Sequence, residues 1–523
     1  MSSQLPILSY QEIEQELQGF EQQERQRLGL AAAAEQQWRD LNPQVFRRQD
    51  RGETTLLIGG LTMAHDCLMQ AALQGLDYKV QLLDCPDTKA LHLGKEFGNR
   101  GQCNPTYFTV GNLIKHLVHL RDVEGLSVEQ IVRSYVFVTA GSCGPCRFGT
   151  YVTEYRKALR DSGFDGFRVL LFQQNGGLKQ ATGDASGLEI TPTFFLQFMK
   201  AMLAGDVLNA MGYRIRPYET VSGATDAAME QAKQEVAGAL RKRRSVVLAM
   251  RRARKFFRSV AVDRSRPAPK VMVIGEFWAM TTEGDGNYRL QRFLEQEGAE
   301  VEVQTITAWV LYLIWLVLHD SRNRARLTAD DHAGEGLRGV NLWVRLGSLH
   351  AADRLLRVMF HTFARAVGLR GVKLPDMQKI ADYAKAHYDV ELRGGEGHME
   401  VGKLIEAIQK QKAHMVVSVK PFGCMPSSGV SDGVQAAVMA QNPGAIFCPV
   451  ETTGDAAVNF QSRVQMFLFK ARQKAREELQ TALDTRGLTM DQFQERAGRG
   501  GCATLAYPKH RYAGTASNQV FEI

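Results

Sequence analysis

The sequence has no hydrophobic run long enough to cross a membrane as a helix. Its longest apolar stretch, ITAWVLYLIWLVL over residues 306–318, has thirteen residues, whereas a membrane-spanning helix needs about 20. We therefore expect a buried helix there and no membrane association. The polar residues 1–19 also lack the basic start and apolar centre of a secretory signal, so we expect a cytoplasmic protein.

The sequence also lacks a disulfide framework and the common nucleotide and metal motifs. It has eight cysteines in 523 residues, and in a reducing cytosol spaced thiols usually serve metal binding or redox chemistry. The histidines show no metal-ligand spacing, and no Gly-x-x-x-x-Gly-Lys-Ser/Thr loop is present. The cysteines are therefore the candidate metal ligands.

Acidic residues are in deficit, because the net charge is +8. Much of this excess lies in residues 241–258, RKRRSVVLAMRRARKFFR, whose interleaved basic and apolar residues predict an amphipathic helix with a solvated basic face. We interpret it as an interdomain helix, with a docking face for an acidic partner as the alternative. No helix-turn-helix, zinc finger or aromatic RNA-binding signature accompanies it, so we expect no nucleic-acid partner.

Strands and helices alternate along most of the chain, which predicts an α/β fold with parallel sheets covered on both faces. Strands are expected at residues 54–60, 78–83, 134–140, 167–172, 270–274, 300–304, 414–419 and 445–449, and helices at 64–76, 107–120, 151–159, 288–297 and 430–439. The domains expected from this pattern are a helical N-terminal segment (1–53), a first α/β domain (54–225), a basic helical linker (226–267) and a second α/β domain (268–523) with a helical insertion (305–411).

Three cysteines share a Cys-x-Pro pattern immediately before a predicted helix, namely Cys103, Cys143 and Cys424. Proline suits the first turn of a helix, and the positive end of the helix dipole favours a thiolate. Predicted strands end just before Cys143 and Cys424, and loops at the carboxyl ends of parallel strands form the ligand crevice. The three thiols can therefore meet and hold iron, which is ligated by thiolates. The alternative is three buried cysteines at tight turns.

Glycines accompany these cysteines, and they allow backbone N–H groups to approach the sulfides of a cluster without interference from a Cβ atom. Gly141, Gly144 and Gly423 are the glycines that we expect to line the cofactor site.

The segment Cys143-Gly-Pro-Cys146 has a second interpretation, because CGPC between a strand and a helix is similar to a thioredoxin active site. Residues 191–193, Thr-Pro-Thr, could imitate the downstream proline of that fold. However, no tryptophan precedes Cys143, the residues after 193 read as a helix, and Cys103 and Cys424 would have no role. In the iron–sulfur interpretation Cys146 is a fourth ligand or a thiol beside the ligands.

The other cysteines and the glycine-containing loops carry weaker signals. Structural burial is expected for Cys67, Cys85, Cys448 and Cys502, although Cys67 and Cys85 leave a larger cluster open. The loop at residues 284–288 could hold an anion at a helix N-terminus, with an ordinary turn as the favoured alternative. Glycine-containing loops at 175–177 and 451–454 could line the same crevice.

Six stretches carry a resemblance to a known family. They are LIGGLTMAHDCLMQAALQGLDYKV, GKEFGNRGQCNPTYFTVGNLIKHL, VFVTAGSCGPCRFGTY, IGEFWAMTTEGDGNYRLQRFLEQEGAEV, VKPFGCMPSSGVSD and ETTGDAAVNFQSRVQMFLFKAR, and they span about residues 54–475 in order. In these stretches the chain resembles the 2-hydroxyacyl-CoA dehydratase and benzoyl-CoA reductase superfamily, specifically its acyl-CoA dehydratase activase-related (CoA-substrate-specific enzyme activase-like) proteins.

The resemblance implies two flavodoxin-like domains that face each other across a cleft and hold a [4Fe–4S] cluster through three cysteines, here Cys103, Cys143 and Cys424. It also implies low-potential electron transfer to a small substrate of the CoA-thioester class. A separate ATP-hydrolysing activator with its own iron–sulfur cluster would supply the electron. Cys146 departs from the three-cysteine pattern, and its role decides between a catalyst with one open iron and an electron carrier. A non-catalytic cluster carrier or scaffold is the remaining alternative.

Overall fold

The computed structural model describes residues 46–141, 146–173, 187–325, 340–392, 395–499 and 508–523, together with Leu337 and a few positions between Leu17 and Gly29. Residues Pro43–Ile523 form one compact unit, and Met1–Asn42 form another. All the elements described below belong to the unit Pro43–Ile523.

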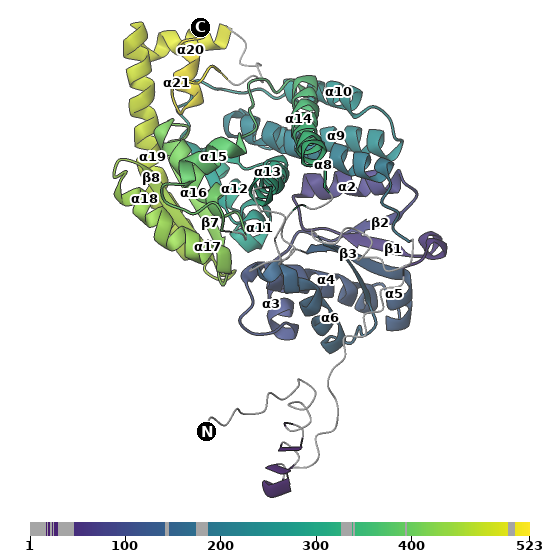
Figure 1. The fold of residues 1–523 in the computed structure, drawn as a ribbon. Coiled ribbons are helices and arrows are strands. Elements are labelled where there is room, and N and C mark those ends of the chain that lie inside the picture. The colour runs from purple at the N-terminus through teal and green to yellow at the C-terminus, as the bar shows by residue number, and fades with distance from the viewer. Residues whose placement is uncertain are drawn as a thin grey trace, which may run out of the picture. The chain divides into compact units, whose positions relative to one another are not determined.

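The described residues of this unit contain eight strands in two four-stranded parallel sheets (Figure 1). The first sheet has the order β2-β1-β3-β4 and the second the order β6-β5-β7-β8. The strands are β1 (Thr55–Ile58), β2 (Lys79–Leu82), β3 (Tyr135–Gly141), β4 (Arg168–Gln173), β5 (Lys270–Gly275), β6 (Glu300–Val303), β7 (Met415–Pro421) and β8 (Ile446–Thr452). Every strand predicted from the sequence is confirmed within two or three residues at each end.

Helices join the strands of the first sheet. They are α2 (Met63–Gln74), α3 (Thr88–Phe97), α4 (Asn104–Asp122), α5 (Val128–Ser134) and α6 (Tyr151–Asp161), the last preceded by the 3₁₀ turn η2 (Arg147–Thr150). No helix was expected between residues 83 and 107, so α3 corrects the sequence-based prediction. The Asp87 side chain caps α3 by accepting a hydrogen bond from Ala90 N at 2.9 Å, a start signal of the usual kind.

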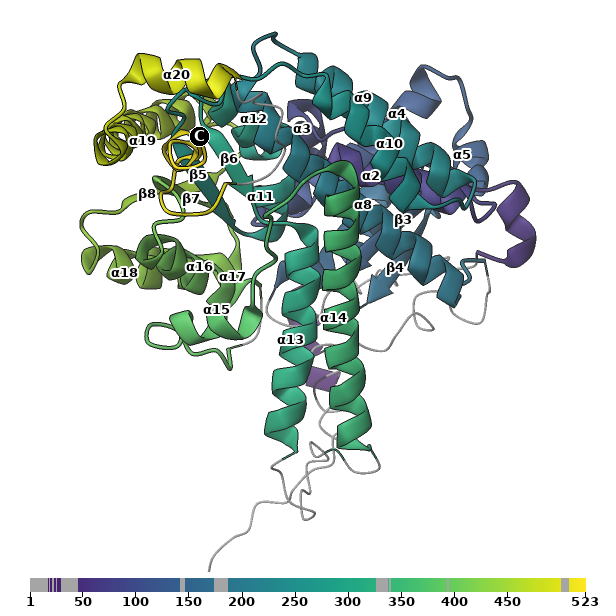
Figure 2. The ribbon, with the colours of Figure 1, turned by 90° about the horizontal axis from the view of Figure 1, so that it is seen from above.

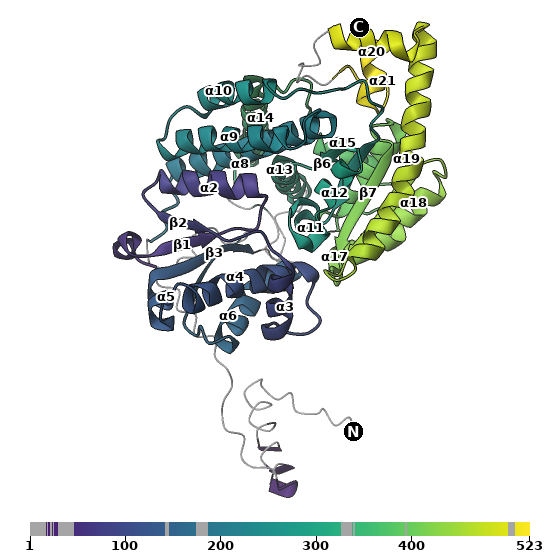
Figure 3. The ribbon, with the colours of Figure 1, turned by 180° about the vertical axis from the view of Figure 1, so that it is seen from behind.

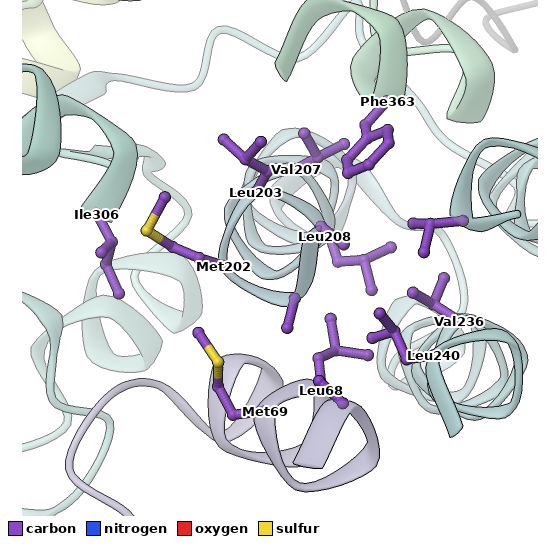
Figure 4. Close-up of a cluster of buried hydrophobic side chains, with 14 of the residues drawn as sticks. Leu68, Met69, Met202, Leu203, Val207, Leu208, Val236, Leu240, Ile306 and Phe363 are labelled. Carbon is purple, nitrogen blue, oxygen red and sulfur yellow. The ribbon is translucent and has the colours of Figure 1, made fainter. Parts of the chain in front are cut away.

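A helical segment follows the first sheet and consists of α8 (Pro192–Ile215), α9 (Ala224–Arg241) and α10 (Val246–Arg258). The predicted basic helix over 241–258 is wrong at its start, because α9 ends at Arg241 and α10 begins only at Val246. Arg243 between them has φ 51°, and Ser245 caps α10 by accepting from Leu248 N. Figure 4 shows α8 amid a buried core cluster, with side chains from α2 and α9 packed around it.

Further helices complete the second half of the chain, which contains the second sheet and begins at β5; the first half contains the first sheet. They are α11 (Phe277–Thr281), α12 (Leu290–Gln296), α13 (Ile306–Arg324), α14 (Leu342–Val367), α15 (Met377–Ala384), α16 (Gly397–Gln409), α17 (Met425–Gly429), α18 (Ala436–Ala440), α19 (Ala457–Arg486), α20 (Met490–Arg499) and α21 (Thr515–Gln519), with the 3₁₀ turn η4 (Asp285–Asn287) before α12 and the π-helical turn η5 (Val430–Gln435) between α17 and α18. Helices α13 and α14 run side by side as a projecting arm (Figure 2). Among the described residues, no helix has both the length and the apolarity needed to cross a membrane.

Both sheets reverse their strand order at one point, and the loops that carry the candidate site residues follow the strands beside it. The order changes between β1 and β3 in the first sheet and between β5 and β7 in the second. In open parallel sheets, ligands bind beside the carboxyl ends of the strands at such a switch point. Cys146 follows β3, Glu276 follows β5, and Cys424 follows β7.

Gly275 gives the first testable prediction, because no side chain fits at the end of β5. Its φ is 129°, and a Cβ atom there would lie 2.0 Å from the Val419 carbonyl oxygen of β7. Gly275→Ala should therefore lower the free energy of unfolding by about 2 to 4 kcal/mol, the combined scale of backbone strain and overpacking.

Gly238→Ala is the matched control, because Gly238 lies within α9 with nothing within 4 Å of its missing Cβ. Alanine there should leave stability unchanged or raise it by about 0.5 to 1 kcal/mol. Denaturant unfolding of both variants measures the difference. Equal effects would contradict the proposed clash at the switch point.

Candidate functional site

Cys103 stands at the start of α4 and is buried among hydroxyl groups. It is the N-cap residue of that helix, with extended backbone, and Pro105 follows in the first turn. Its Sγ atom lies 3.1 Å from both Thr106 Oγ1 and Tyr151 Oη. The sequence prediction that Cys103 immediately precedes a helix is confirmed, although the helix begins at Asn104 rather than Tyr107.

The loop that carries Cys424 touches Cys103 directly. Asn104 N donates to Phe422 O at 3.1 Å, and a Cβ atom on Gly423, whose φ is 75°, would lie 3.3 Å from Cys103 Cα. Cys424 is buried at the start of α17. Figure 3 shows the corresponding elements, α4 of the first half and α11 and α17 of the second, on facing sides. The fold therefore brings together two cysteines that are 321 positions apart (424 − 103).

Cys146 is the third described thiol of this region. It caps η2, and its Sγ accepts a hydrogen bond from Phe148 N at 3.5 Å. The next residue, Arg147, donates from its guanidinium to Gly101 O and lies beside Gly423. Arg147 thus links the loop of Cys146 with the loops of Cys103 and Cys424.

Two carboxyl groups face these thiols. Glu276 follows β5 and accepts hydrogen bonds from Trp278 N and Ala279 N at 3.1 and 2.8 Å. Glu396 is buried just before α16. Burial raises the pKa of both carboxyls, and the charge of Glu276 raises the pKa of Glu396 further. Like charges in a poorly solvated site disfavour ionisation, so this pair tends to hold a proton.

The same carboxyls disfavour thiolates at Cys146 and Cys424 when no cation is bound. Burial raises the pKa of Cys146 to about 12, and the charges of Glu276, Glu396 and Cys103 add to this effect. Burial and Glu276 likewise raise the pKa of Cys424, against hydrogen bonds from Ser427. Because Glu276 and Glu396 act on both thiols, Cys146 and Cys424 share one electrostatic environment.

Of the predicted site residues, two lie outside the described residues, namely Cys143 and Gly144. Gly423 lies against the backbone of Cys103, as given above. Gly141 ends β3, and a Cβ atom there would lie 2.9 Å from Leu171 Cδ1. Its lack of a side chain therefore serves packing within the first sheet.

The remaining described cysteines have other surroundings. Cys67 is packed into the core of the first half, and its pKa is raised by burial, with Lys233 and Glu230 of α9 as charged neighbours. The Cys85 Sγ lies against Gly284, and Cys448 is fully buried in β8. Cys502 lies outside the described residues. Among the described residues, the contacts of Cys67, Cys85 and Cys448 thus differ from those of Cys103, Cys146 and Cys424.

The glycine-containing loop at 284–288 forms an ordinary turn that docks on the first half. Asp285 N donates to Pro86 O at 3.0 Å, and the Asp285 carboxylate accepts from Thr88 N and Thr88 Oγ1. A Cβ atom on Gly286 would lie 2.2 Å from the Trp278 ring. The loop's close approaches are thus to protein, as the favoured sequence interpretation expected. The loop at 175–177 lies outside the described residues.

Two kinds of metal site can be compared with these thiols, a single ion and a cluster. In the part of the chain that the structure describes, no group of three or more His, Cys, Asp or Glu side chains could hold one metal ion. A single ion is bound by thiolates whose sulfurs each lie about 2.3 Å from the metal. In a cubane cluster each thiolate binds a different iron, so the thiolate sulfurs lie roughly 6 Å from one another. Three thiols on separate loops that meet at two switch points are compatible with the second arrangement.

Four residues of this region were missed in the sequence analysis: Thr106, Tyr151, Glu276 and Glu396. Two signals were available, because Thr106 stands at the third helical position after an N-cap cysteine and Glu276 directly follows the apolar strand VMVIG. Glu396 and Tyr151 become neighbours of the thiols only through long-range packing, so no local pattern marks them.

The comparisons with known proteins add no name to this site. No protein-family model matches the chain, and no curated protein matches it.

Proposed function

We propose that the chain holds a [4Fe–4S]-type cluster between its two halves and passes low-potential electrons to a small substrate. The observation that carries this proposal is the contact between the Cys103 and Cys424 loops, with Cys146 linked to both through Arg147. This contact places cysteine-bearing loops of both α/β units in one buried region. The resemblance of the six sequence stretches supports the same assignment.

Cys103, Cys143 and Cys424 would hold the cluster, which supplies one-electron chemistry at low potential when bound. Glu276 and Glu396 hold a proton beside the site, and the buried loops around Cys103 exclude water from it. If Cys146 remains a free thiol, one iron stays open to substrate and the chain is a reductase or dehydratase component. If Cys146 is a ligand, the chain is an electron carrier.

Several finer assignments belong to the same proposal. The two halves are flavodoxin-like, doubly wound domains whose sheets face each other across a cleft. An ATP-hydrolysing protein with its own iron–sulfur cluster supplies the electron, and the substrate is a small molecule of the CoA-thioester class. The protein works in the cytoplasm, without nucleic acid or membrane as partner.

Iron content tests the proposal directly. Protein prepared without oxygen should carry about four irons and four sulfides per chain and lose its colour in air, because an incompletely ligated cluster is open to oxidants. Iron and sulfide assays with electron paramagnetic resonance of the reduced protein are the measurements. Folded, colourless protein after anaerobic preparation with iron and sulfide supplied would exclude the cluster.

A thiol–disulfide oxidoreductase that uses Cys143 and Cys146 is the second candidate, because Cys146 follows β3 and opens η2. One observation stands against it. Thr191 caps α8 and Pro192 is its first residue, so this proline opens a long helix rather than a strand. Disulfide reductase activity in iron-free protein would favour this candidate.

A further inference from the structure

Cys103 has two hydroxyl neighbours on its sulfur, and this sets it apart from the other described thiols. Thr106 Oγ1 and Tyr151 Oη each lie 3.1 Å from Cys103 Sγ. All three side chains are buried, with exposed fractions of 2% for Thr106 and 6% for both Cys103 and Tyr151. Water therefore does not compete for these hydrogen bonds.

The direction of both hydrogen bonds is fixed once Cys103 is a thiolate. A thiolate has no proton, so both hydroxyls must donate and the sulfur accepts. The hydroxyl groups of threonine and tyrosine both carry a proton at neutral pH, so each has one proton to donate. Thr106 stands in the first turn of α4 and Tyr151 at the start of α6, which are rigid elements.

Cys103 consequently differs from Cys146 in the contacts of its sulfur, whereas Cys424 has hydrogen bonds from Ser427. Cys146 accepts one long N–H bond, from Phe148 at 3.5 Å, and faces the carboxyls of Glu276 and Glu396. Cys103 Sγ lies 3.1 Å from each of two hydroxyl oxygens, and as a thiolate it would accept from both. Hydrogen bonds to the sulfurs of a cluster stabilise its reduced, more negative state and so raise its reduction potential.

We propose that Thr106 and Tyr151 are positioning residues that donate two hydrogen bonds to the Cys103 sulfur and thereby raise the reduction potential of the cluster. This inference rests on the proposed function, because it needs a cluster held by Cys103. It assigns no new ligand. Thr106 and Tyr151 keep the reduction potential of the cluster high enough for the electron donor to reduce it.

Tyr151→Phe and Thr106→Val test this inference, since each removes one donor and keeps the shape of the side chain. Both variants should keep the iron content of the parent protein and shift its midpoint potential to more negative values. The potential is measured by reductive titration followed by electron paramagnetic resonance. The Thr106→Val, Tyr151→Phe double variant should shift further than either single variant.

Two control variants separate this role from a structural one. Tyr155→Phe removes another buried phenol, one turn further along α6. The ring centroids of Tyr155 and Phe137 lie 5.0 Å apart. This variant should leave the midpoint potential unchanged. Thr106→Ser keeps the hydroxyl and should restore the parent potential.

The possible outcomes point to different failures. Iron-loaded Tyr151→Phe and Thr106→Val proteins with the parent potential would overturn the inference while leaving the proposed function in place. Loss of iron from these variants, or from Thr106→Ser, would also overturn it, because the residues would then hold the fold of the site rather than the potential. Iron-free parent protein would instead contradict the proposed function itself.

Discussion

Serine in place of Cys103 or Cys424 is expected to lower the iron content of the protein by roughly tenfold or more, since even the loss of a group that only supports a ligand can cost 10- to 100-fold in metal affinity. A serine hydroxyl keeps its proton at neutral pH and is a poor ligand for iron. Both sulfurs are buried at helix starts from opposite halves of the chain.

Cys67→Ser is the control among the described residues, because Cys67 lies on α2 against the core, with α9 residues as its charged neighbours. Cys502→Ser is a second control from the C-terminal region. Both should keep the parent iron content. Circular dichroism and thermal unfolding of each variant show whether the fold is intact.

The pattern across four variants decides between the candidate functions. Loss of iron in the Cys103, Cys143 and Cys424 variants with retention in Cys146→Ser would identify a three-thiolate site with an open iron. Loss in all four would identify an electron carrier. If only Cys143 and Cys146 affect activity, and Cys103 and Cys424 do not affect iron, the thiol oxidoreductase is correct.

The strands could be predicted from the sequence because their signals are local. Most are short runs of β-branched and aliphatic residues, and glycine stands at the end of some, as at Gly59 and Gly275, while β2 and β6 alternate polar and aliphatic residues. Short apolar runs bounded by turn residues are typical of buried parallel strands. The alternation with helices then predicts parallel pairing, and the structure confirms it for every described strand pair.

The electrostatics of the site could not be predicted, because they depend on distant segments. Glu396 belongs to a glycine-rich stretch after α15, and its charge acts on Cys424 of the same half and on Cys146 of the other half only in the folded chain. Its burial and its coupling to Glu276 are consequences of tertiary structure. The Cys-x-Pro pattern predicted the thiols themselves because its basis, a proline in the first turn of a helix, is local.

The site combines thiols that need a cation with carboxyls that hold a proton. Without a metal, burial and Glu276 raise the pKa of Cys424, and burial raises that of Cys146 to about 12. Both are therefore thiols at neutral pH, and loading with iron must release their protons.

A buried ion pair far from the thiols gives the last prediction, and its effect is on stability. Glu300 begins β6, and its carboxylate accepts hydrogen bonds from Arg214 at 3.1 Å, Tyr218 at 2.7 Å and Thr515 at 2.6 Å. The pair is almost fully buried, with side-chain exposures of 0% for Arg214 and 3% for Glu300. It joins α8, β6 and the C-terminal helix α21. Glu300→Gln should lower the free energy of unfolding by about 3 to 5 kcal/mol at pH 7, because it leaves the charge of Arg214 buried without its counter-ion.

The effect should also depend on pH in a defined direction. Burial alone would raise the pKa of Glu300, but the charge of Arg214 leads the interactions that lower this pKa from its ordinary value of 4.5 to about 2. A depressed carboxyl pKa contributes stability that is present above the unfolded value and lost as the pH falls toward the folded value. The parent protein should therefore lose about 3 kcal/mol of this contribution between roughly pH 4.5 and 2, and Glu300→Gln should not. Urea unfolding at pH 7 and pH 3 measures the loss in both proteins.

Glu235→Gln, which breaks the exposed pair with Arg252, is the control and should lower the free energy of unfolding by less than about 1 kcal/mol at either pH. Equal losses in the two variants would show that burial does not strengthen the Glu300 pair.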